Sequence, residues 1–204
     1  MPRVRLLIDR RFLTAVVIGL AAFTAVGSSA GTPKGLMPVA GPFLAASDGL
    51  YDAMLKASPA NLPTGVSAPQ TAPVELQDDD RRSGVIGALQ VTFRSSDPSA
   101  KINYVFFTNA EQAKAYAQRI DGMVRSSGGR AIFLPYSTNA DCAASSATGH
   151  MLCTEAVDRV VVISLAAEAE GTNDNARGPV SLAGPLIKAA LDHLANVKKA
   201  SGLS

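Results

Sequence analysis

The sequence predicts a two-layer α+β domain, with two helices on one face of a four-stranded, mainly antiparallel sheet, in the order β-β-α-β-β-α. Three observations predict this fold. Short segments alternate apolar and polar side chains, as half-buried strands do. Longer segments carry apolar residues at helical spacing. Both patterns fall within residues 83–204, which we therefore assign to one globular domain.

The first two strands are predicted to form an antiparallel hairpin. Leu89, Val91 and Phe93 alternate with polar residues, and the segment 101–107 repeats that alternation. Between them, residues 96–99 read Ser-Asp-Pro-Ser, a composition typical of a turn.

A helix should follow the hairpin. Thr108 precedes Glu111 by three residues, the spacing of a capping box. An apolar stripe at helical spacing comes next, made of Tyr116, Ile120, Met123 and Val124. Gly128 and Gly129 then end the helix.

The second half is predicted to repeat this order. We expect a strand at 131–136, a loop from Ser137 to Cys153, and a strand at 159–165. The β-branched run 160–163 in that last strand favours a central position covered on both faces. A closing helix is expected to start near Pro185, because proline suits a first helical position. On that helix we expect His193 at the surface.

The N-terminus has the features of an export signal. Several arginines precede an uncharged apolar run from Phe12 to Val26, which at about 15 residues is shorter than the roughly 20 of a membrane-spanning helix. Small residues before Ala30 predict cleavage between Ala30 and Gly31, so that residues 1–30 are a signal peptide and no stable membrane span remains. An uncleaved N-terminal anchor is the alternative. Either reading places the protein in the bacterial periplasm or outside the cell.

The export route stays open. Arg10 and Arg11 precede Phe12 as in a twin-arginine signal, but without the usual intervening residue, which favours the general secretory route. Residues 31–82 are rich in proline and alanine and are predicted to be a flexible tether with a short helix near 48–57.

The chain has two cysteines, Cys142 and Cys153. In an oxidising compartment an even pair is most simply a disulfide, and we expect one here. The neighbouring residues do not supply the four ligands of a zinc site, so no metal is expected.

Composition and motifs argue against several classes of function. The net charge is only +2 and the sequence contains no tryptophan, so a basic face with stacking aromatics, and with it nucleic-acid binding, is not expected. No phosphate-binding or dinucleotide motif occurs, and no cofactor is expected.

The candidate recognition site is the cysteine loop. Its polar residues are Asp141, Ser145, Ser146, Thr148 and His150. The favoured function is a non-catalytic exported binding module, whose partner is a protein, a peptide or a component of the cell envelope. The alternative is a small exported hydrolase with its site around His150, since serine, histidine and aspartate all occur in this loop.

Overall fold

A computed structural model describes residues 49–76, 78–95, 99–132, 134, 139–145, 149–167 and 182–203 of the protein. All of these residues belong to one compact unit, 40–204. The predicted signal peptide, the cleavage site between Ala30 and Gly31, and the loop residues Ser146 and Thr148 lie outside the described residues.

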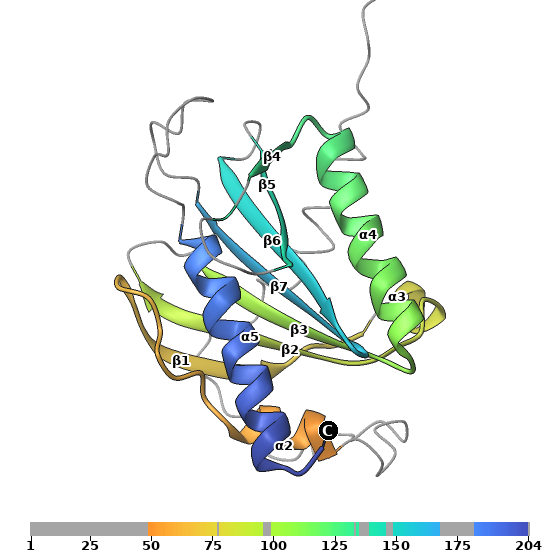
Figure 1. Ribbon diagram of the computed structural model, residues 1–204, viewed down its shortest axis with the longest axis vertical. Coiled ribbons are helices and arrows are strands. Elements are labelled where there is room, and N and C mark those ends of the chain that lie inside the picture. Colours follow the sequence, from red (N-terminus) through yellow and green to blue (C-terminus); the bar gives the residue numbers. More distant parts are fainter. Residues whose placement is uncertain are drawn as a thin grey trace, which may run out of the picture. The chain divides into compact units, whose positions relative to one another are not determined.

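The centre of this unit is an antiparallel sheet of seven strands, in the order β1-β2-β3-β7-β6-β5-β4 (Figure 1). The strands are β1 (Val66–Pro73), β2 (Val85–Ser95), β3 (Lys101–Phe107), β4 (Arg130–Ile132), β5 (Asp141–Ser145), β6 (His150–Val157) and β7 (Val160–Ala167). The helices are α2 (Gly49–Lys56), α3 (Asp78–Arg82), α4 (Ala110–Ser126) and α5 (Ala183–Ala200).

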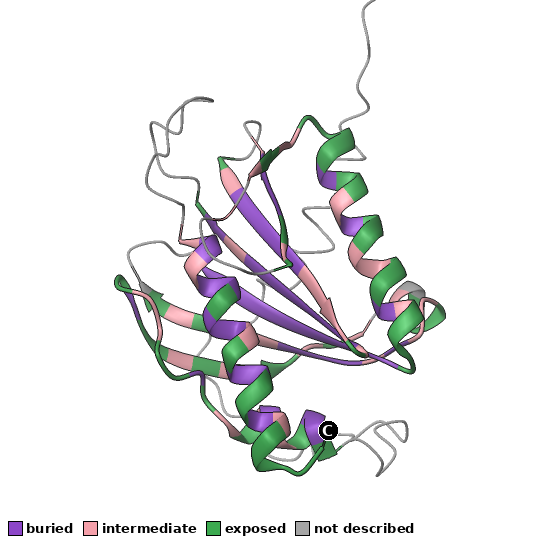
Figure 2. Ribbon diagram, viewed as in Figure 1, coloured by how far each residue is buried: buried purple, intermediate pink, exposed green. Residues whose placement is uncertain are grey.

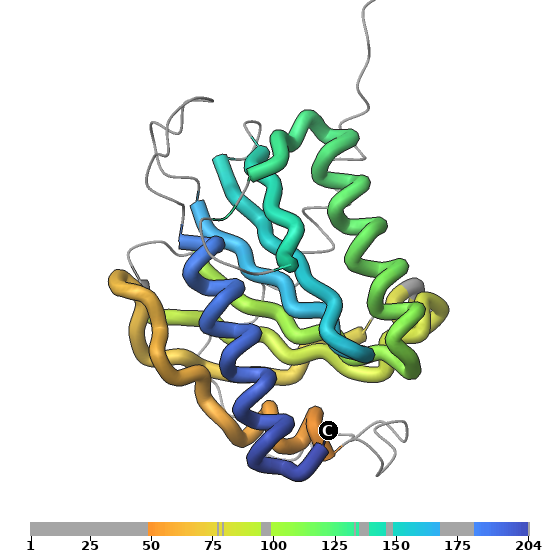
Figure 3. The backbone as a smooth tube through the Cα atoms, viewed as in Figure 1, coloured from red at the N-terminus to blue at the C-terminus, as the bar shows by residue number. Residues whose placement is uncertain are grey.

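The predicted four-stranded sheet is wrong, because the described residues form a sheet of seven strands. The predicted hairpin is present as β2 and β3. The strand expected at 159–165 is β7, which lies in the middle of the sheet with Val160 to Ile163 buried. After β3 the chain runs through α4, β4, β5 and β6 before β7 returns beside β3 (Figure 3).

Three strands escaped the sequence analysis for different reasons. β1 contains Pro69 and Pro73, which are tolerated because β1 is an edge strand. β5 consists of small residues without a clear alternation. β6 mixes apolar with polar residues, and its first four residues, 150–153, fell within the segment expected to be the cysteine loop.

The two long helices cover opposite faces of the sheet, not one face as the sequence predicted. On one face, Tyr104 of β3 donates a hydrogen bond to the backbone carbonyl of Ala190 in α5. On the other face, the ring of Phe107 lies 5.0 Å from that of Tyr116 in α4. The central strands β3 and β7 are buried nearly throughout (Figure 2). Apolar side chains on both sides of these strands require cover on both sides, which makes three layers.

The folded unit includes part of the segment assigned to the tether. The strand β1 pairs with β2 along most of its length. The helix α2 buries Leu50, Tyr51 and Met54, and the ring of Tyr51 meets that of Phe106 edge-on at 5.2 Å. The sheet and its helical cover therefore begin before residue 83.

The cap of α4 differs from the expected capping box. Asn109 is the N-cap residue, and its side-chain oxygen accepts a 2.9 Å hydrogen bond from the backbone N–H of Gln112. The hydroxyl of Thr108 instead donates to the backbone carbonyl of Gly84. Asparagine and threonine are both good N-caps, so sequence alone did not distinguish these neighbours.

Candidate functional site

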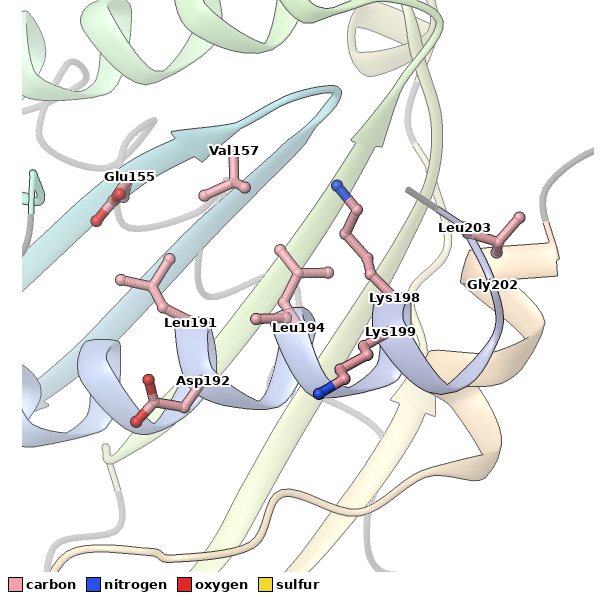
Figure 4. Close-up of a pocket in the computed structure, with 10 residues that line it drawn as sticks. Glu155, Val157, Leu191, Asp192, Leu194, Lys198, Lys199, Gly202 and Leu203 are labelled. Carbon is pink, nitrogen blue, oxygen red and sulfur yellow. The ribbon is translucent and has the colours of Figure 1, made fainter.

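A groove lies between α5 and the C-terminal end of β6 (Figure 4). Its volume is about 690 Å³, within the usual range for sites that bind small molecules. It is lined by Glu155, Val157, Leu191, Asp192, Leu194, Ala195, Lys198, Lys199, Gly202 and Leu203. We call it the α5–β6 groove.

The α5–β6 groove exists because α5 packs most closely on β7 and leaves the end of β6 partly uncovered. Val157 on β6 and Leu191 on α5 are half-buried and line it from its two sides (Figure 4). Leu194, one turn further along α5, is buried at its floor. These side chains give the groove an aliphatic surface that remains open to a ligand.

Two of the four charged side chains that line the groove are already paired. The carboxylate of Asp192 forms an ion pair with the ammonium group of Lys188, one helical turn earlier, with Nζ and Oδ2 2.7 Å apart. Lys198 pairs with Asp158 in the turn between β6 and β7. Both pairs are partly exposed to solvent, so we read them as the rim of the groove.

Glu155 differs from these residues. It is half-buried on β6, and its Oε2 atom is buried without a hydrogen-bond partner in the part of the chain that the structure describes. Burial raises the pKa of this carboxyl group above its ordinary value, and the negative charge of Asp141 raises that pKa further. A buried acceptor of this kind costs free energy unless something donates to it.

A smaller cavity of about 270 Å³ lies on the other side of α5, against the segment that follows α2. His193 lines this cavity and is 7% exposed, so the expectation of a surface histidine is wrong. The imidazole lies 6.2 Å from the ring of Tyr104, and burial lowers the pKa of His193. The helical face that carries Leu194 is wider than the sequence analysis assumed.

The predicted recognition loop proves to be mostly a β-hairpin. Asp141 and Ser145 begin and end β5, and His150 begins β6. Cys142 and Cys153 are opposed on these strands, with Cα atoms 4.0 Å apart and sulfur atoms at disulfide distance.

The structure separates the serine, histidine and aspartate of the alternative hydrolase hypothesis. Ser145 is paired with His150, but Asp141 is paired with Thr154. Because strands rise about 3.3 Å per residue, Asp141 lies roughly 13 Å along the hairpin from His150. This aspartate cannot orient that histidine as a triad requires.

Glu155 and the groove were missed by the sequence analysis, although β6 carries a signal for Glu155. Met151, Cys153, Glu155 and Val157 alternate along the face that meets α5, and Glu155 is the one charged residue among these four. Once 150–157 is recognised as a strand, an acid at an inward position stands out. The opposing wall comes from α5, about 35 residues later in the chain, which no local pattern indicates.

Within the described ranges, no three His, Cys, Asp or Glu side chains gather as metal ligands would. In the same ranges, no helix has the length and apolarity needed to cross a membrane. Comparisons of the chain with family models, curated proteins and solved structures found no match.

Proposed function

We propose that this protein is an exported, non-catalytic binding module that holds its ligand in the α5–β6 groove. The observation that carries the proposal is the groove itself, an aliphatic cavity of about 690 Å³ with one unsatisfied acidic group on its wall. Ligand sites are commonly concave and apolar, with a few polar groups that fix orientation.

The residues that line the groove favour binding over covalent catalysis. They provide carboxylates, ammonium groups and aliphatic surface, but no serine, cysteine or histidine among the side chains placed there. A nucleophile paired with a base is therefore not part of this lining. The groove also replaces the cysteine hairpin as our first candidate for recognition.

Export is supported by the N-terminal sequence and by the cysteine pair. An arginine-rich flank, an apolar run and small residues before Gly31 follow the order of a secretory signal. The disulfide distance between Cys142 and Cys153 suits an oxidising compartment. The ligand is then a component of the periplasm, the envelope or the medium.

The test is ligand binding to the full chain after the groove has been filled. Ala195 is exposed on α5 and lines the groove, whereas its neighbour Asn196 is equally exposed but does not. We expect Ala195→Phe to abolish retention of small molecules co-purified from envelope extracts and detected by mass spectrometry. Asn196→Phe is the matched control and should retain them. Equal retention by both variants would refute the groove as the site.

A further inference from the structure

We propose that the ligand of the α5–β6 groove is an aliphatic primary amine, whose ammonium group is bound by Glu155 and whose hydrocarbon chain lies on Val157 and Leu191. This inference rests on the proposed binding function and adds the chemical class of the ligand. Its starting point is the position of Glu155 on the groove wall opposite α5 (Figure 4).

Glu155 brings a carboxylate with one unsatisfied oxygen to the wall of an apolar groove. Met151, Cys153 and Val157 occupy the neighbouring inward positions of β6 and pack in the core. Glu155 follows the same alternation, so its side chain emerges on the face that meets α5. Its Oε2 atom is buried and lacks a donor among the described residues. A ligand in the groove that carries an N–H or O–H group can donate to the part of this carboxylate that lines the groove.

Charge decides between possible donors. A hydroxyl or amide would satisfy the acceptor atom but leave the negative charge in an apolar surrounding. An ammonium group donates to the acceptor atom and also compensates the negative charge. Charge-assisted hydrogen bonds are about twice as strong as neutral ones. The nearby charge of Asp141 adds to this preference, because it also repels the Glu155 carboxylate and raises the pKa of that group.

The lysines of the groove offer less to a ligand. Lys198 is engaged by Asp158. Lys199 is exposed near the C-terminal end of α5, where its ammonium remains hydrated and a surface ion pair contributes little. The acidic Asp192 is likewise paired, with Lys188. Glu155 is therefore the charged group in the groove that a ligand would stabilise most.

The side chains that line the groove indicate the chemistry of the ligand beyond its ammonium group. Val157 and Leu191 expose aliphatic surface, and burial of each methylene contributes about 0.8 kcal/mol. The groove contains no aromatic side chain on which a ring could stack. An extended alkyl chain suits this surface, and n-hexylamine is the simplest probe with the required chemistry.

The experiment compares n-hexylamine, n-hexanol and hexanoate by calorimetry and by backbone amide shifts in the full chain. The three probes share a chain length and differ in their head groups. We expect hexylamine to bind most tightly, with shifts at Leu191 and Ala195. Glu155→Gln should weaken hexylamine about tenfold, or about 1.4 kcal/mol, and leave hexanol nearly unchanged. Glu111→Gln, the same substitution at an exposed acid on α4 outside the groove lining, is the matched control and should alter hexylamine affinity less than about twofold.

The outcomes separate the two proposals. If hexanol or hexanoate binds the groove as well as hexylamine, or if Glu155→Gln leaves hexylamine affinity intact, the amine assignment is wrong while the groove remains a binding site. If no probe shifts Leu191 or Ala195 and Ala195→Phe retains its envelope ligands, the proposed function fails as well. Thermal melts accompany each variant. We expect Glu155→Gln to melt no lower than the parent at pH 7, since it removes a half-buried carboxylate with an unsatisfied oxygen.

Discussion

Cys142 and Cys153 face each other directly across β5 and β6, with their Cα atoms 4.0 Å apart. A disulfide here joins two strands that already pair, next to the core beneath α5. The bond would therefore fix the register of the hairpin whose strands carry Asp141, Ser145 and His150, which we first considered for recognition.

We predict that both cysteines are oxidised in the exported protein. Alkylation without reductant, followed by intact-mass analysis, should modify neither cysteine. Replacing both with alanine should lower the free energy of unfolding by about 2–3 kcal/mol, because the bond closes a short loop in the unfolded chain. Two alkylated thiols in freshly exported protein would contradict the prediction.

The mature chain is predicted to begin at Gly31. The basic flank, the apolar run and the small residues ending at Ala30 all favour cleavage at that bond. N-terminal sequencing of protein from the cell envelope would measure this directly. Recovery of an intact Met1 would show that the segment is kept as an anchor.

Asn109→Ala should lower the free energy of unfolding by about 1 kcal/mol, because it removes the side-chain acceptor for the N–H of Gln112. Glu111→Ala is the matched control in the same exposed first turn and should cost less. Urea denaturation of the two variants compares them. A larger loss for Glu111→Ala would instead support the capping box that the sequence suggested.

The buried hydroxyl of Tyr104 donates a 3.2 Å hydrogen bond to the carbonyl of Ala190, and so ties β3 to α5. We expect Tyr104→Phe to destabilise the protein by about 1 kcal/mol, the net contribution of a typical hydrogen bond. The ring and its packing are retained, so the secondary structure seen by circular dichroism should not change. An unchanged denaturation midpoint would show that this bond contributes nothing.

His193 should make stability fall on acidification. Burial lowers its pKa in the folded state, so below the ordinary value of 6.5 the unfolded chain takes up a proton more readily than the folded chain. Its contribution to stability is full above pH 6.5 and declines as the pH falls from there toward the lower folded pKa. His193→Gln should flatten this part of the stability curve, measured by urea denaturation from pH 7.5 to 5. A curve with the same slope in the variant would assign the effect to other groups.

The sequence by itself determined the elements whose signals are local. The alternation in Leu89 to Phe93 and in 101–107 predicted the β2–β3 hairpin, and the β-branched run from Val160 predicted the central strand. Helical spacing found most of α4 and α5. In each case the signal lies within a single segment, so its periodicity or composition is sufficient.

Only the tertiary structure decided the size of the sheet, the faces that the helices cover and the position of the groove. The strand β1 is a strand because β2 offers it hydrogen-bond partners, although its prolines argue against one. Glu155 and Leu191 line the same groove because α5 packs beside β6, although the two residues are far apart in sequence. Such pairings depend on where whole elements pack. The packing energy comes from contacts between residues that are far apart in the sequence, so no local pattern indicates it.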